Sequence, residues 1–126
     1  MLDHIGLDVA DYERSKAFYI PVLQTLGMEL LMEPAPVVGG FGFRSEQKPF
    51  FWIGCRERPP QSGVHVAFQA GSREIVDAFH AAALGTGATD NGGPGVRELY
   101  HPSYYGAFVL DPDGNNVEAV SHSPAE

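Results

Sequence analysis

The sequence has a single cysteine, few basic residues and no long hydrophobic run, and each of these scarcities excludes a class of protein. Cys55 alone forms neither an internal disulfide nor a cysteine-rich zinc module. Lys and Arg number 8 against 16 Asp and Glu, which gives a net charge of −8 and a pI near 4.9. Because basic residues do not cluster, nucleic acid and anionic membranes are disfavoured as partners.

No stretch approaches the roughly 18 apolar residues that span a bilayer. The first residues also lack the basic and apolar regions of a signal peptide, so we expect a cytoplasmic protein. The chain of 126 residues is 44% apolar and 19% charged, a composition that can bury a core and does not suit disorder. We therefore predict one domain over residues 1–126 that binds a small molecule or another protein.

The chain repeats itself when it is shifted by 61 residues, a shift that places His4 on His65. The residues that follow match in kind, as in the pairs Ile5/Val66, Leu7/Phe68, Glu13/Glu74, Ala17/Ala78, Phe18/Phe79 and Leu23/Leu84. Each copy begins with alternating apolar residues, which predict a strand, and continues with a helical pattern. Asp11 and Ser72 are predicted to cap the two helices at their N-termini.

Shorter strand signals follow each helix, so each copy predicts a βαβββ module. They lie at residues 28–32, 41–43 and 50–54 in the first module, and at 104–110 and 116–120 in the second. The glycine-rich stretch 85–95 stands where the second module needs its remaining strand, and its segment 91–95 has the composition of a loop. We predict an α+β fold with modules at about 1–58 and 62–122, which pack together within one chain or between two, because a module of about 60 residues is marginal alone.

Strand alternation places two histidines and a glutamate on the face that the helices leave free. His4 and His65 occupy equivalent positions of the repeat and point away from the apolar, helix-facing set. Glu118 does the same between Val117 and Ala119. Two neutral imidazoles and one carboxylate suit a first-row divalent metal with open coordination positions, so we predict a metal site for Fe, Mn, Ni, Co or Zn at these three residues.

The same segments resemble the vicinal oxygen chelate superfamily, which includes glyoxalase I (lactoylglutathione lyase), fosfomycin-resistance thiol transferases, extradiol dioxygenases, methylmalonyl-CoA epimerase and metal-free bleomycin-resistance proteins. The resemblance rests on residues 2–9 around His4, the pair Phe18-Tyr19, residues 64–68 around His65, and residues 111–118 ending in Glu118. It implies paired βαβββ modules that form a cupped mixed β-sheet around a metal held by His4, His65 and Glu118. It also implies a homodimer.

The sequence departs from each named enzyme at one position or more. Trp52 aligns with the strand residue that supplies a fourth, carboxylate ligand in glyoxalase I. Phe108, ten residues before Glu118, corresponds to the acid–base tyrosine of extradiol dioxygenases. Gly6 and residues 98–102 replace the threonine and the lysine-serine loop of the fosfomycin transferases. These departures disfavour the named reactions and leave lyase, isomerase or dioxygenase chemistry on a small oxygen-chelating substrate.

Further site residues are predicted around this metal. His101 precedes the strand that leads into the 111–114 turn and is a candidate acid–base group. Tyr104 and Tyr105 alternate faces, so one of them points into the cavity and the other towards the helix layer. We name both tyrosines, His101 and Glu118 as catalytic candidates.

Trp52 and Phe108 are the predicted substrate-binding wall, and His80 and His122 are expected at the surface. A 2+ ion with Glu118 and two neutral histidines leaves a local charge of about +1, which favours an anionic substrate with two chelating oxygens. The alternative hypothesis is a metal-free small-molecule binding protein of the bleomycin-resistance type, which would hold an aromatic ligand on Trp52 and the tyrosines.

Overall fold

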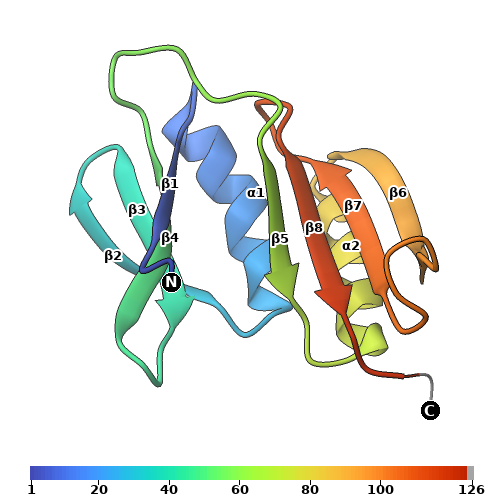
Figure 1. Ribbon diagram of the computed structural model, residues 1–126. Helices are drawn as coiled ribbons and strands as arrows, with labels where there is room; N and C mark the ends of the chain where they lie inside the picture. The colour runs from blue at the N-terminus through green and yellow to red at the C-terminus, as the bar shows by residue number, and fades with distance from the viewer. Residues whose placement is uncertain (125–126) are drawn as a thin grey trace.

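The computed structural model describes residues 1–124, which form two helices and eight strands arranged in two four-stranded sheets (Figure 1). The first module contains β1 (Ile5–Asp8), α1 (Tyr12–Gln24), β2 (Glu29–Ala35), β3 (Val38–Phe43) and β4 (Lys48–Gly54). The second module contains β5 (His65–Gln69), α2 (Arg73–Gly85), β6 (Thr89–Val96), β7 (Tyr105–Leu110) and β8 (Asn116–Ser121).

Both sheets have the same topology. The strand order is β1-β4-β3-β2 in the first sheet and β5-β8-β7-β6 in the second. The strand before the helix pairs in parallel with the last strand of its module, and the other pairs are antiparallel. This duplicated arrangement confirms the predicted α+β fold of two βαβββ modules, each of which forms its own four-stranded mixed sheet. It also leaves β1 and β5 as edge strands, each with one side that no other strand of residues 1–124 pairs with.

The two helices begin where the sequence predicted. The side chain of Asp11 accepts a hydrogen bond from the backbone N–H of Arg14 at 3.2 Å, and that of Ser72 accepts from Ile75 at 3.3 Å. Each cap satisfies a backbone donor that has no partner within the helix. Among residues 1–124, neither helix is long and apolar enough to cross a membrane.

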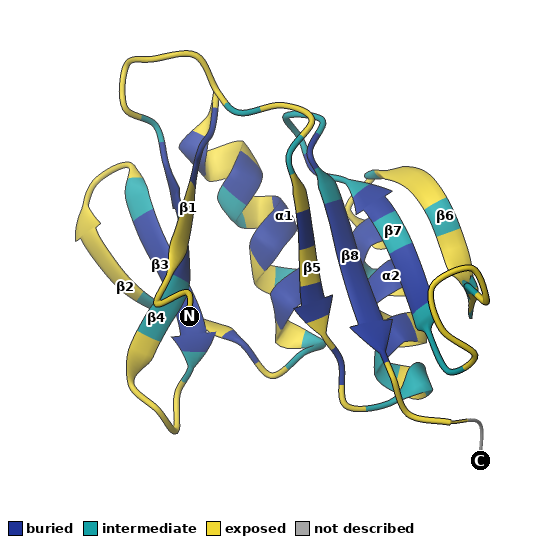
Figure 2. Cartoon of the chain, viewed as in Figure 1, coloured by how far each residue is buried: buried dark blue, intermediate teal, exposed yellow. Residues whose placement is uncertain are grey.

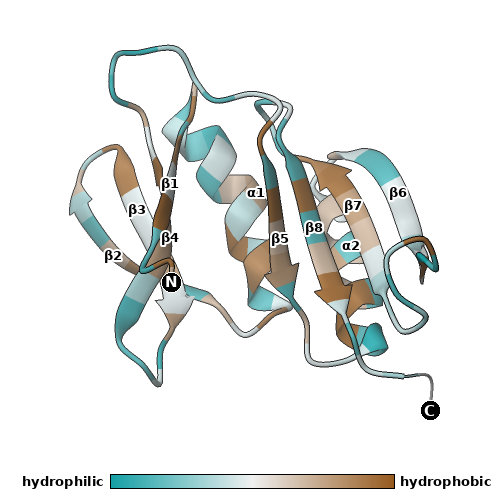
Figure 3. Cartoon of the chain, in the orientation of Figure 1, coloured by the Kyte–Doolittle hydropathy of each residue, from teal (hydrophilic) through white to brown (hydrophobic). Residues whose placement is uncertain are grey.

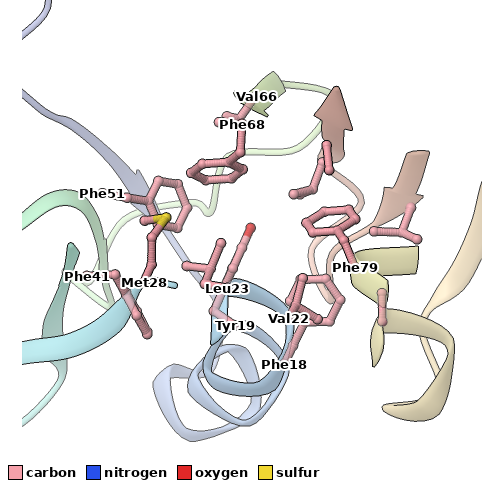
Figure 4. Packing of buried hydrophobic residues seen from close by; sticks show 14 of the residues in the cluster. Phe18, Tyr19, Val22, Leu23, Met28, Phe41, Phe51, Val66, Phe68 and Phe79 are labelled. Carbon is pink, nitrogen blue, oxygen red and sulfur yellow. The ribbon is translucent and has the colours of Figure 1, made fainter. Parts of the chain in front are cut away.

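One hydrophobic core joins the two modules (Figure 4). Tyr19 of α1 packs edge-on against Phe18, with ring centroids 4.8 Å apart, and against Phe51 of β4 at 5.0 Å. Phe51 in turn meets Phe68 of β5 edge-to-face at 5.2 Å, which links the first sheet to the second. The contact between α1 and α2 closes the core on the helical side. The modules are therefore packed together within one chain, and the helix-free faces of both sheets remain for function.

The glycine-rich part of the second module has the composition of a loop but forms a strand. Residues 89–96 form β6, which pairs with β7 through two register shifts and is mostly exposed (Figure 2). Glycines at bulges allow this irregular pairing, and tertiary pairing here prevails over a low strand propensity. The hydrophilic segment 55–64 joins β4 to β5 over the end of the molecule (Figure 3).

Candidate functional site

The centre of the candidate site is the carboxylate of Glu118, in the middle of β8. This charged side chain is fully buried. Its Oε1 lies 2.7 Å from Nε2 of His65, the first residue of β5. In the parallel pairing of β5 with β8, Ala67 lies opposite Glu118, so His65 reaches the carboxylate diagonally. Sequence alternation placed His65 and Glu118 on one face, and the structure brings the two side chains into contact.

The other oxygen of Glu118 accepts a hydrogen bond from the hydroxyl of Tyr104. Burial and this hydrogen bond raise the pKa of the Tyr104 phenol to about 12, so the hydroxyl keeps its proton at neutral pH. Gly106 leaves room for the carboxylate, because a Cβ added there would lie 3.0 Å from Oε2. Phe108 lies opposite Glu118 on β7, and its ring centroid is 6.3 Å from that of His65. An imidazole, a neutral phenol and an aromatic ring thus surround the carboxylate.

The two adjacent tyrosines point to opposite faces of the sheet, as their alternation predicted. The hydroxyl of Tyr105 donates to Asp77 of α2 at 2.6 Å, and the guanidinium of Arg73 lies 5.0 Å from the centre of its ring. Tyr104 therefore lies at the candidate site, whereas Tyr105 belongs to the helix layer and is not brought to Glu118.

His101 also lies outside the contacts of Glu118. Its Nδ1 accepts the backbone N–H of Ser103 at 3.0 Å, within the exposed connection between β6 and β7. Its ring lies 6.4 Å from that of His122, which is exposed as expected and packs edge-on against Tyr104 at 5.4 Å. The ring of His101 is thus linked to the site through the neighbouring aromatic rings, and its carbonyl accepts the backbone N–H of Tyr104 at 3.0 Å.

The expectation that His80 lies at the surface is wrong. This residue of α2 is 8% exposed, and its Nε2 lies 3.0 Å from Oδ1 of Asp90. Asp90 belongs to β6, so the burial follows from the strand that the glycine-rich stretch forms beside α2. A hydrogen bond from the backbone N–H of Gly92 and a second from His80 lower the pKa of the Asp90 carboxyl.

His4 lies on the other sheet, immediately before β1. It is exposed, and its Nδ1 is 2.8 Å from Oδ1 of Asp3. Together with Trp52 and Arg56 it lines an open cavity of about 450 Å³ on the helix-free face of the first sheet. Sequence reasoning named His4 and Trp52 but missed Arg56, because nothing in its local pattern distinguishes it from Arg58.

Trp52 occupies the position in the first module that Glu118 occupies in the second. Gly6 lies opposite Trp52 across the β1–β4 pair, just as Ala67 lies opposite Glu118 across the β5–β8 pair. Gly6 and Ala67 are themselves equivalent in the 61-residue repeat. The alignment that placed Trp52 at the equivalent of Glu118 is therefore correct.

The predicted metal ligands do not all meet within one chain. Within residues 1–124, no group of three or more His, Cys, Asp or Glu side chains is placed to hold a metal ion. In Figure 1, β1 runs upwards from near the marked N-terminus, whereas β5 begins at the upper end of the view and runs downwards. His4, just before β1, and His65, at the start of β5, thus lie at opposite ends of these two edge strands.

A larger cavity, of about 510 Å³, lies elsewhere, between α1, residues 86–89 and residues 110–112. Its charged groups already have partners. Arg14 binds Asp113 at 3.1 Å, and Asp111 accepts the hydroxyl of Tyr19 at 2.6 Å. The candidate site residues lie instead on the helix-free faces, around Glu118 and Trp52.

Duplicated βαβββ sheets define a recognised class of fold, and comparison with known proteins shows which family this chain belongs to. The sequence matches the Glyoxalase/Bleomycin resistance protein/Dioxygenase superfamily over residues 1–119. The chain therefore belongs to that superfamily. No curated protein matches it.

Solved structures support the same assignment. A glyoxalase/bleomycin resistance protein from Albidiferax ferrireducens T118 is 31% identical, with a TM-score of 0.80 over 96% of this chain and 98% of the other. A glyoxalase/bleomycin resistance protein/dioxygenase family enzyme from Burkholderia phytofirmans PsJN is 20% identical, with a TM-score of 0.72 over 96% and 98%. A lactoylglutathione lyase from Agrobacterium tumefaciens is 16% identical, with a TM-score of 0.66 over 96% and 90%. At 20% and 16% identity, the similarity to the second and third of these structures establishes the fold alone.

Proposed function

We propose that the protein is a divalent-metal-dependent, glyoxalase-like enzyme acting on a small substrate with two chelating oxygens. The observation that carries this proposal is the buried carboxylate of Glu118. Among the described residues its one ion-pair partner is His65, and neither Lys nor Arg reaches it. A buried carboxylate is stable when a cation or a metal compensates it, so this pair fits a metal ion.

His65 and Glu118 supply an imidazole and a carboxylate, the donors that Fe, Mn, Co, Ni and Zn accept, and His4 is the proposed third ligand. When bound, a divalent ion supplies Lewis-acid polarisation of substrate oxygens, which suits lyase, isomerase or dioxygenase chemistry. Tyr104 orients Glu118 by donating a hydrogen bond, and hydrogen bonds of this kind tune a ligand's affinity for its metal. Phe108 and Trp52 form the walls that hold the substrate.

A second copy of the chain completes the proposed site. Within the described residues, no strand pairs with the outer edge of β1 or β5, and each edge carries one of the two repeat-equivalent histidines. Apolar side chains of Met1, Leu2 and Ile5 are exposed along the β1 edge, as expected at an interface. A twofold-symmetric homodimer that sets β1 of one copy beside β5 of the other would bring His4 to His65 and Glu118 twice.

Metal analysis tests the proposal. The protein, purified without chelator, is expected to carry or take up about one divalent ion per chain, measured by elemental analysis after incubation with Mn, Fe, Co, Ni or Zn. His65→Ala is expected to lose this ion, whereas His122→Ala, which changes an exposed histidine outside the ligand set, is expected to keep it. Absence of stoichiometric uptake, or full occupancy in His65→Ala, would overturn the proposal.

A metal-free binding protein is the second candidate, and the Trp52 cavity favours it. That cavity on the first sheet is present within a single chain, without the Glu118 pair. The same metal analysis separates the two candidates, because a metal-free binding protein would take up no stoichiometric ion. Such a protein would also bind its ligand fully in the presence of a chelator, and His65→Ala would not change that ligand binding.

A further inference from the structure

The floor of the Trp52 cavity has no neighbouring side chain in register with the indole, because glycines lie opposite the tryptophan on both neighbouring strands. Gly6 of β1 and Gly40 of β3 are its partners in the sheet. A Cβ added at Gly40 would lie 2.8 Å from two carbons of the indole ring, so the ring lies directly over the backbone of β3. An indole laid against glycine offers one open face to a planar ligand.

Arg56 lies at the rim of this floor with unsatisfied hydrogen-bonding capacity. The one carboxylate within 4.0 Å of its guanidinium, among the described residues, is that of Asp8, at 3.9 Å, which is too long for a hydrogen bond. Asp8 is already occupied, because its oxygens accept from Arg58 at 2.6 and 3.2 Å and from Gln61 at 3.3 Å. The side chain of Arg56 is about half exposed and runs past Gly54, where an added Cβ would lie 3.4 Å from Nε.

The charges around the cavity leave it locally positive although the protein is acidic. Asp3, beside His4, lies 3.0 Å from the ammonium of Lys48. Asp8 is neutralised by Arg58 in the same way. Arg56 is the one Lys, Arg, Asp or Glu among the residues that line the cavity, and its nearest carboxylate, that of Asp8, is 3.9 Å away. A guanidinium in this state binds the paired oxygens of a carboxylate or phosphate through two parallel hydrogen bonds.

We propose that this cavity binds a planar, aromatic or conjugated anion, whose ring stacks on Trp52 and whose anionic oxygens pair with Arg56. The inference deepens the proposed function by naming the substrate class. Binding of the anion does not depend on the proposed function; only a reaction of the bound anion rests on it. Arg56 is thus a specificity-determining residue that selects an anionic ligand over a neutral one of the same shape.

Trp52 is the chain's single tryptophan, so its fluorescence reports binding at the cavity directly. The full-length protein is titrated with benzoate, phenyl phosphate and the neutral benzamide, in the presence of a chelator that removes metal. We expect saturable fluorescence changes with one or both anions and at least ~10-fold weaker binding of benzamide, the loss that accompanies one charge-assisted hydrogen bond.

Arg56→Gln is expected to weaken the better-bound anion by at least ~10-fold and to leave benzamide binding unchanged. Arg44→Gln is the matched control, because it removes an equal charge from a residue that pairs with Glu29 away from the cavity. The preferred anion identifies the ligand group as carboxylate or phosphate. Equal binding of benzamide, no binding of either anion, or equal effects of the two variants would overturn the inference.

The metal experiment and this titration fail independently. If anions bind through Arg56 and no metal is taken up, the enzyme proposal is wrong and the anion site remains. If metal binds to His65 and Glu118 but the fluorescence titration shows no anion dependence, the enzyme proposal remains and the substrate class is wrong.

Discussion

Nε2 of His65 and Oε1 of Glu118 lie 2.7 Å apart, although 53 positions separate the two residues in the sequence. The parallel pairing of β5 with β8 produces this contact, and that pairing is dictated by the βαβββ module. The equivalent place in the first module pairs Gly6 with Trp52. The duplicated module thus carries an imidazole–carboxylate pair in its second copy and an indole ring at the equivalent place in its first copy.

Tyr104→Phe is expected to weaken metal binding by roughly 10–100-fold, because Glu118 loses the hydroxyl that orients it. Tyr105→Phe is the matched control, since that neighbouring hydroxyl bonds Asp77 on the helix side. Calorimetric titration of both variants with Zn²⁺ or Co²⁺ measures the difference. Equal affinities for the two variants would contradict the role assigned to Tyr104.

Gly40→Ala is expected to lower the free energy of unfolding by about 1–3 kcal/mol, because the added Cβ would lie 2.8 Å from the Trp52 ring and from Cβ of Pro49. The fluorescence of Trp52 should change with it. Gly85→Ala is the control, at the end of α2, where a Cβ meets open space and helix propensity predicts a gain of up to about 1 kcal/mol. Urea denaturation followed by circular dichroism measures both, and a neutral or stabilising Gly40→Ala would show that the indole does not lie against β3.

Tyr19→Phe is expected to cost about 1–3 kcal/mol of stability at neutral pH, because the buried Asp111 loses a hydrogen bond of 2.6 Å. Asp111 keeps its bonds from Asp113 and Asn115, which limits the loss. The measurement is chemical denaturation of both proteins under identical conditions, and unchanged stability would contradict the contribution assigned to this hydrogen bond.

The same residue predicts a dependence on alkaline pH. Burial and the charge of Asp111 raise the pKa of the Tyr19 phenol well above its usual value near 10. The unfolded chain therefore ionises first as the pH rises, and the stability that Tyr19 contributes is present below about pH 10 and lost above it. The difference in stability between the wild type and Tyr19→Phe should shrink above about pH 10, and a difference that grows would contradict this account.

The fold could be predicted from the sequence because both copies of the repeat carry the same pattern of strand alternation and helix caps. Asp11 and Ser72 cap equivalent helices, and the alternation around His65 and Glu118 fixes which face the helices cover. The repeat required a strand in the stretch 85–95, but its glycines lack strand propensity, so the sequence did not give the bounds of β6 and its segment 91–95 had the composition of a loop. The burial of His80 against Asp90 follows from the position of that strand beside α2 and was not predicted.

Less of the site could be predicted. Alternation shows that Tyr104 and Tyr105 face opposite ways, but no flanking apolar residue decides which of them meets Glu118. Arg58, and not Arg56, forms the close ion pair with Asp8. The path of the 55–64 connection decides this pairing, and the sequence pattern does not reveal that path. The prediction of His4, His65 and Glu118 as one ligand set stays a prediction, because it depends on the contact between two chains.

Mixing two variants of the chain tests that set most directly. His4→Ala and Glu118→Gln each remove one ligand from every proposed site, so neither homodimer should hold a tightly bound divalent ion. When equal amounts are unfolded and refolded together, a twofold dimer with shared sites recovers about a quarter of the wild-type metal, because half of the dimers are mixed and each contains one intact site. Recovery near that level in elemental analysis supports the account. No recovery, although mixed dimers form, would contradict it.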